Sequence, residues 1–145
     1  MIYLDYAATT PVDQRVLNAM FPYFREAFGN PSSVHRLGQK AEAAVDQARE
    51  KVASVLHCKP EEIIFTSCGT EADNLALRGA AMARRAASGE KWILTAKTEH
   101  HAVSKTAEQL EKEYGFLLEW LDVNKYGAVT PESLSKAVCN QTALA

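Results

Sequence analysis

The sequence has no apolar run of the roughly 20 residues that a helix needs to cross a bilayer. Its N-terminus also lacks the basic stretch and the long apolar stretch of a secretory signal. Basic and acidic residues nearly balance, with 16 Lys and Arg against 18 Asp and Glu, so no positive field attracts nucleic acid. We therefore expect neither a membrane protein nor a nucleic-acid-binding protein, and we predict a location in the cytoplasm or an organelle equivalent.

Cysteine is scarce as well. The three cysteines are Cys58, Cys68 and Cys139, and none forms a CxxC pair. This predicts free thiols in a reducing compartment. The histidines and cysteines also lack the spacing of zinc ligands, so we predict no metal site. Neither GxxxxGK[ST] nor GxGxxG is present, which excludes the two common glycine-rich phosphate loops.

Apolar residues follow helical and strand patterns in turn along the chain. The predicted helices are 11–28, kinked or split at Pro22, then 34–56, 71–87, 101–114 and one that starts at Thr130 and Pro131. The predicted strands are 62–66, which we expect to be buried, 92–95, 116–121 and one that starts at Thr142. Strands that alternate with helices of this length predict βαβ units and a mostly parallel sheet. The chain reaches residue 145 on an apolar run, so we expect the front part of a larger α/β protein.

Turn residues separate these elements. Gly89 and Gly115 follow predicted helices, and glycine accepts the left-handed conformation that ends many helices. Residues 124–127 have turn composition. Thr130 is a suitable N-cap for the last helix.

Residues 67–70, Ser-Cys-Gly-Thr, lie between a predicted strand and a predicted helix. Ligands of parallel α/β sheets bind at the carboxyl ends of the strands. The first N–H groups of the following helix lack internal partners, and the helix dipole favours an anion there. Gly69 lets the backbone approach a ligand closely, and Ser67 and Thr70 add hydroxyl donors. The stretch is either a phosphate seat or an ordinary helix-capping turn.

The next strand is followed by Thr98-Glu99-His100-His101, at the same end of the sheet by the right-handed βαβ rule. A histidine there can stack on a flat heterocycle or transfer a proton near neutral pH. Alternatively, His100 caps the following helix or faces solvent. A phosphate seat with a stacking histidine one strand away suits a phosphorylated aromatic cofactor, for which pyridoxal 5'-phosphate (PLP) is the obvious candidate.

Four segments together resemble the N-terminal part of the NifS/IscS-like cysteine desulfurases, which are PLP enzymes of the class V aminotransferase fold. They are YLDYAATTPVD at 3–13, FGNPSSVHRLG at 28–38, EIIFTSCGTEADNLAL at 62–77 and KTEHHAV at 97–103. The resemblance covers essentially all 145 residues. It implies an α/β fold: an incomplete large domain of the class V type, with a mostly parallel sheet and flanking helices. Residues 1–15 would border the active site, and residues 16–145 would begin the PLP-binding domain.

The resemblance also implies roles for single residues. Gly69 and Thr70 would hold the PLP phosphate, and His100 would stack on the pyridine ring and assist proton transfer. The residues that would line or border the active-site entrance, some reaching a neighbouring subunit, are Ala8, Thr9, Asn30 and His35. Cys68 does not match the position of the family's nucleophile, so the resemblance gives it no catalytic role.

In the family reaction, L-cysteine becomes L-alanine and the sulfur remains on an enzyme cysteine as a persulfide. The low-pKa thiolate that accepts it and the Schiff-base lysine that anchors PLP are expected after residue 145. The implied partners are L-cysteine, a sulfur-acceptor or scaffold protein of iron–sulfur cluster assembly, and a second copy in a full-length homodimer.

Three alternatives remain open at the level of the sequence. One is another class V PLP enzyme, such as a selenocysteine lyase. The second is a truncated, non-catalytic module that interacts with or regulates a full-length relative. The third is an unrelated anion-binding α/β domain.

Because no lysine has the context of the family's anchor, we predict that this chain binds PLP noncovalently. Borohydride reduction followed by intact-mass measurement should then leave most of the protein unmodified. Stoichiometric trapping of PLP on one lysine would contradict this prediction.

Overall fold

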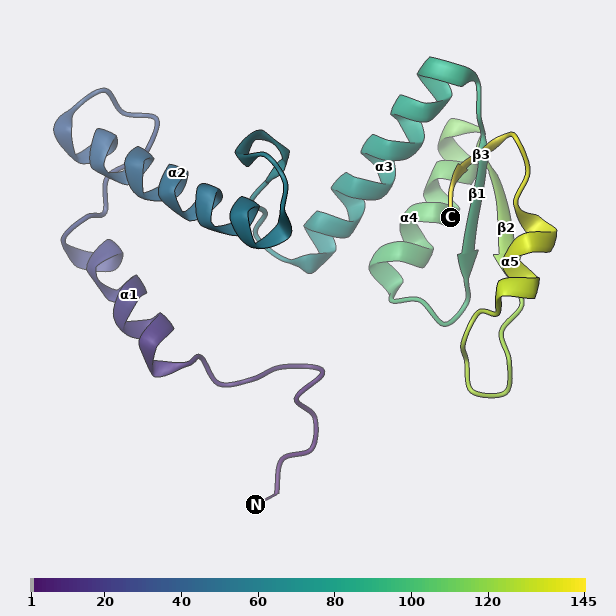
Figure 1. Ribbon diagram of the computed structural model, residues 1–145, viewed down its shortest axis with the longest axis horizontal. Helices are drawn as coiled ribbons and strands as arrows, with labels where there is room; N and C mark the ends of the chain where they lie inside the picture. The colour runs from purple at the N-terminus through teal and green to yellow at the C-terminus, as the bar shows by residue number, and fades with distance from the viewer. Residues whose placement is uncertain (1) are drawn as a thin grey trace. The chain divides into compact units, whose positions relative to one another are not determined.

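A computed structural model describes residues 2–145. The chain divides into two compact units, Met1–Ile64 and Phe65–Ala145. Figure 1 labels the elements of both units. The domain division predicted after residue 15 stays a prediction. No helix among the described residues is long and apolar enough to cross a membrane.

The first unit contains α1 (Gln14–Arg25), α2 (Arg36–Leu56) and the short 3-10 helix η1 (Pro60–Glu62). Helix α1 begins after Asp13, whose carboxylate accepts the Arg15 N–H at 2.8 Å. Of the kink or split predicted at Pro22, the split is wrong, because α1 continues through this residue as one helix. Proline removes one internal hydrogen bond, and the helix ends at Arg25. Phe28, predicted as part of the same stripe, therefore lies beyond the helix.

Helix α2 confirms the predicted long helix. Its C-cap is His57, in the left-handed conformation with φ 54°. The turn before it is closely packed, since a Cβ on Gly38 would lie 2.0 Å from the Ser33 carbonyl oxygen. Only glycine fits that approach.

The predicted buried strand at 62–66 is wrong. Residues 63–66 have no regular secondary structure, and Ile64 is 68% exposed. A strand needs a neighbour to share its backbone hydrogen bonds. The sheet formed by the described residues contains β2, β1 and β3, and this segment is not part of it.

The second unit has the predicted α/β organisation. Its elements are α3 (Gly69–Ser88), β1 (Trp92–Ala96), α4 (His101–Tyr114), β2 (Leu117–Leu121), α5 (Pro131–Ala137) and β3 (Thr142–Leu144). The strand order is β2-β1-β3, and β1 pairs in parallel with both neighbours. This confirms the parallel sheet and every predicted helix and strand after residue 70.

The core of this unit lies between α3, α4 and the sheet (Figure 1). Its buried members are Ala81, Ile93, Ala107, Leu110, Phe116 and Ala143. Gly89 and Gly115 end α3 and α4 with φ of 74° and 69°, which confirms both predicted caps.

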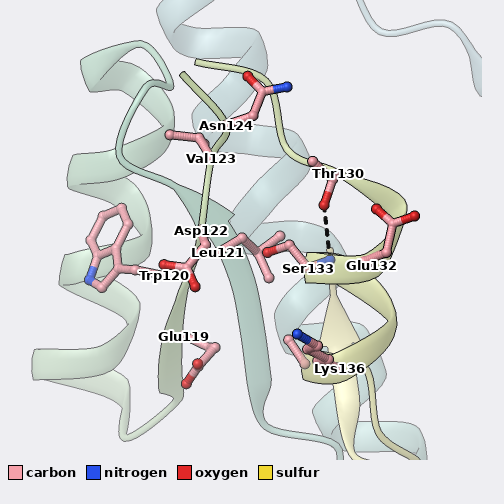
Figure 2. A pocket seen from close by; sticks show the side chains of 11 residues that line it. Glu119, Trp120, Leu121, Asp122, Val123, Asn124, Thr130, Glu132, Ser133 and Lys136 are labelled. Atoms are coloured by element: carbon pink, nitrogen blue, oxygen red, sulfur yellow. Dashed lines mark hydrogen bonds between the residues drawn. The ribbon is translucent and has the colours of Figure 1, made fainter. Parts of the chain in front are cut away.

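Helix α5 packs beside β2. Thr130 Oγ1 accepts the Ser133 N–H at 3.2 Å, which confirms the predicted N-cap (Figure 2). In the same view Leu121 points toward α5, whereas Trp120 points to the opposite side of the strand. The alternation follows from the two-residue period of a strand.

We predict that Leu110→Ala destabilises the protein by about 2–5 kcal/mol, because it leaves a cavity in a closely packed core. Leu110 is fully buried, whereas Leu75 on α3 is 47% exposed. Leu75→Ala is therefore the control and should cost much less. Urea unfolding of the two variants checks the difference, and equal losses would contradict the assigned core.

Candidate functional site

The chain path brings the N-termini of α3 and α4 to one edge of the sheet. Helix α3 leads into β1 through residues 89–91, and β1 leads into α4 through residues 97–100. Both helices therefore begin near the carboxyl end of β1 (Figure 1). A cavity of about 330 Å³ lies there. Its lining residues are Thr70, Asn74, His100, His101, Ala102, Lys105, Thr106 and Gln109.

The first turn of α3 leaves room and donors for an anion. The first internal helix bond runs from the Ala72 N–H to the Cys68 carbonyl at 3.1 Å. The N–H groups of Gly69 and Thr70 precede it and have no partner within the helix. A Cβ built on Gly69 meets nothing within 4 Å, so the space beside this backbone is open. The predicted phosphate seat thus fits the local geometry.

Ser67 differs from its predicted role as a phosphate donor. Its backbone N–H and its hydroxyl both donate to Glu71 Oε2, each at 2.6 Å. The Ser67 hydroxyl is the largest cause that lowers the pKa of Glu71 below its ordinary value. Glu71 therefore ties the residue before the N-cap to the first turn of α3, in the manner of a capping box.

The Cys68 thiol also lies at the N-terminus of α3 and is exposed. The backbone N–H of Glu71 is the main cause that lowers the pKa of Cys68 below its ordinary value, with a further contribution from the Ser67 hydroxyl. The contact does not amount to a full capping hydrogen bond. Thiolate stabilisation at a helix N-terminus is a general electrostatic effect, and it does not by itself make Cys68 a nucleophile.

His100 caps α4, as one of the two sequence interpretations predicted. Its Nδ1 accepts the Ala102 N–H at 3.1 Å. An accepting Nδ1 carries no proton, so this contact assigns the proton of the neutral ring to Nε2. The side chain remains exposed and lines the same cavity as Thr70. Capping therefore orients the ring and does not remove it from the site.

The sequence interpretation missed four polar residues of this cavity: Asn74, Lys105, Thr106 and Gln109. Asn74 Nδ2 donates to the Thr70 carbonyl at 2.8 Å, and Thr106 Oγ1 lies 2.8 Å from Asn74 Oδ1. Helical spacing was the available signal. Asn74 follows Thr70 by one turn, and the other three recur on one face of α4.

Four further predicted site residues lie in the first unit. Asn30 Oδ1 accepts the Ser32 N–H at 2.9 Å, and His35 Nδ1 accepts the Gly38 N–H at 3.2 Å. Ala8 and Thr9 lie in an exposed turn, where both N–H groups donate to the Asp5 carbonyl. Their placement at the border of the site stays a prediction.

A second cavity, also about 330 Å³, lies between β2 and α5 (Figure 2). Glu119, Asp122, Glu132 and Lys136 contribute its charged side chains. None of the predicted site residues lines it. Among residues 2–145, no group of three or more histidine, cysteine or acidic side chains is arranged to hold a metal ion.

Comparison with known proteins gives one consistent result. The family model described as Aminotransferase class-V matches residues 2–145. The chain is 47% identical to the cysteine desulfurase IscS of Dictyoglomus turgidum over 143 residues, which cover 99% of this chain and 36% of the relative. It is 46% identical to the cysteine desulfurase IscS of Methanosarcina thermophila over 143 residues, covering 99% of this chain and 35% of the relative.

Solved structures agree with these sequence matches. A NifS-like protein superposes with a TM-score of 0.86 at 40% identity, covering 97% of this chain and 38% of that protein. SspA in complex with cysteine superposes with a TM-score of 0.84 at 36% identity, covering 97% of this chain and 40% of that protein. The chain spans about a third of the length of the curated relatives it matches.

We predict a specific acid response from Glu71. Its pKa is lowered in the folded protein, so its hydrogen bonds stabilise the fold above the ordinary value of 4.5. That stabilisation is lost as the pH falls through the lowered pKa. Glu71→Gln should be less stable than wild type at neutral pH and should lose less stability on acidification.

Thermal unfolding from neutral pH to below the pKa of Glu71 measures this difference. Glu119→Gln is the matched control, since Glu119 is an exposed carboxylate of β2. Parallel pH curves for wild type and Glu71→Gln would contradict the proposed cap.

Proposed function

Because the chain belongs to the aminotransferase class-V family, we propose that it is the N-terminal portion of a PLP-dependent cysteine desulfurase. The proposed reaction converts L-cysteine to L-alanine and leaves the sulfur on an enzyme cysteine as a persulfide. One observation carries the proposal: Thr70, beside an anion-accepting helix N-terminus, and His100 line the same cavity. Relatives named cysteine desulfurase support the choice of reaction within the family.

The residues present fit the phosphate and ring of PLP. The N–H groups of Gly69 and Thr70 and the Thr70 hydroxyl would hold the phosphate, aided by the positive end of the α3 dipole. The His100 ring would pack against the pyridine ring and hold it in the cavity. When bound, PLP supplies an electron sink for negative charge on the substrate carbon.

The hydrogen bond to His100 also indicates which ring nitrogen is available for proton transfer. Nδ1 is engaged with the Ala102 N–H, so Nε2 is the ring atom that would hold or release a proton near the ligand. The same hydrogen bond keeps the ring from rotating freely, which lowers the entropy cost of stacking. His100 would therefore act first as a fixed stacking surface and second as a proton-transfer group.

Other groups complete the proposal. Ala8, Thr9, Asn30 and His35 would border the entrance to the site, and residues 1–15 would form part of that border. No lysine here has the context of the family's covalent anchor, so we do not expect this chain alone to complete the reaction.

The proposed partners follow from the proposed reaction. L-cysteine would be the substrate, which agrees with the solved relative described as a complex with cysteine. The persulfide sulfur would pass to an acceptor or scaffold protein for iron–sulfur cluster assembly, and the full-length protein would act as a homodimer. We also propose a reducing compartment such as the cytoplasm, which agrees with the three free cysteines of the chain.

We predict that His100→Asn weakens PLP binding by roughly two- to tenfold, the range of one ring-stacking contact. Asparagine preserves a good N-cap acceptor for α4 while removing the ring. The neighbouring His101 also lines the cavity, so His101→Ala tests whether the loss is specific to His100, and it should weaken binding less. Titration of the purified protein followed by PLP absorbance measures both.

Two results would count against this assignment. Wild-type protein that fails to bind PLP would contradict the cofactor site. Equal PLP affinity for wild type and His100→Asn, with a loss of affinity for His101→Ala, would show that His101 and not His100 stacks on the ring.

A further inference from the structure

We infer that Asn74 and Thr106 are positioning residues that fix the separation between the phosphate seat and the stacking histidine. The cavity would then select ligands that contact both ends at once. The inference rests on the proposed function, because PLP is the ligand that would span the two ends. Asn74 and Thr106 are not among the residues that would touch the phosphate or stack on the ring.

Asn74 connects α3 to α4 at the level of the cavity. Its Nδ2 donates to the Thr70 carbonyl at 2.8 Å, and its Oδ1 lies 2.8 Å from Thr106 Oγ1. The carbonyl of Thr70 can only accept, so the amide orientation is fixed with its nitrogen toward Thr70. The amide oxygen is thereby left for the Thr106 hydroxyl.

Thr106 carries the link into α4. The side chain is buried, at 3% exposure, and its single hydroxyl hydrogen lies between Asn74 Oδ1 and the Ala102 carbonyl at 2.7 Å. The N–H of Ala102 in turn donates to His100 Nδ1. A continuous path of hydrogen bonds and one residue's backbone thus joins Thr70 to His100.

The apolar contacts between the helices do not set this separation alone. Ala81, Ala107 and Leu110 hold the helices close, but apolar contacts are not directional and tolerate small sliding motions. Hydrogen bonds depend on both distance and angle. Sliding would stretch the Asn74–Thr106 hydrogen bond and leave the Thr106 hydroxyl only its bond within α4, to the Ala102 carbonyl, so the contact between the helices resists sliding.

A second contact between the same helices provides a comparison. Arg78, one turn beyond Asn74 on α3, donates to the Gln109 side-chain oxygen. Arg78 does not line the cavity, whereas its partner Gln109 does, so this contact controls both for helix packing and for the loss of a polar contact at the cavity wall. A general loss of helix packing should follow from removing either contact, whereas a loss of ligand spacing should follow only from removing the one at Asn74.

Inorganic phosphate and PLP together distinguish an effect on the spacing between Thr70 and His100 from an effect on phosphate affinity alone. Inorganic phosphate needs only the N-terminus of α3, whereas PLP needs the seat and the His100 ring together. Thr106→Val keeps the size and branching of the side chain but removes the hydroxyl. It should weaken PLP binding by about fivefold, the ratio supplied by one neutral hydrogen bond, and leave phosphate binding unchanged.

The experiment compares wild type, Thr106→Val, Thr106→Ser, Asn74→Ala and Arg78→Ala as purified proteins. PLP binding is followed by absorbance, and inorganic phosphate binding by phosphorus NMR, which suits weak affinities. Thr106→Ser retains the hydroxyl and should restore wild-type PLP affinity. Asn74→Ala removes the same Asn74–Thr106 hydrogen bond by changing a half-buried residue. It therefore provides the PLP affinity without this bond if Thr106→Val does not fold.

The expected result is a selective loss of PLP affinity in Thr106→Val and Asn74→Ala, with Thr106→Ser and Arg78→Ala unchanged. If wild type binds PLP and the two variants bind it equally well, the positioning role is wrong and the proposed function stands. Equal losses in Arg78→Ala, or parallel losses for phosphate and PLP, would also overturn it. Wild type that binds neither ligand would instead overturn the proposed function, and the inference with it.

Discussion

The site depends on one packing constraint: α3 and α4 both run antiparallel to β1 and pack on the same side of the sheet. Ala81 and Leu110 are fully buried between these elements, beside Ile93 of β1. This arrangement brings two helix N-termini to one edge of the sheet, where unpaired N–H groups and two aligned dipoles create a positive region. If either helix ran in the opposite direction along the sheet, Thr70 and His100 would lie at opposite ends of the helix pair.

Side chains within the second unit prepare this region before any ligand binds. Glu71 and Ser67 stabilise the turn before α3, and His100 closes the first turn of α4 through Ala102. The space beside the Gly69 backbone is open, and Thr70 lines the cavity. The candidate site therefore combines a hydrogen-bonded rim with a small set of available donors, an arrangement that would lower the ordering cost of binding the proposed phosphate.

Much of the second unit could be predicted because its signals are local. Gly89 and Gly115 adopt the left-handed conformation that their positions required, and Thr130 caps α5 through its own hydroxyl. The prediction of a strand at 62–66 is wrong because a strand depends on neighbouring strands that are distant in the sequence, and its own apolar pattern does not reveal them. The predicted split at Pro22 is wrong for a different reason: a helix can continue through the loss of one hydrogen bond.

The candidate site could be predicted only in part, because some of its contacts form between residues that are distant in the sequence. Thr70 and His100 follow strand ends, and topology alone brings such positions together. The partner of Ser67 was not predicted, although Glu71 lies only four residues away, because Ser67 was interpreted as a ligand donor. Asn74 and Thr106 are 32 positions apart and meet only after the helices pack. Their hydrogen bond depends on the tertiary structure, and no alternation of apolar residues indicates it.

The most direct test of the account is a map of backbone amide NMR shifts during titration with PLP. The account predicts the largest changes at Gly69 and Thr70, which would hold the phosphate, together with changes at the amides of α4 next to the His100 ring. Changes confined to other parts of the chain, such as the cavity between β2 and α5, would contradict it.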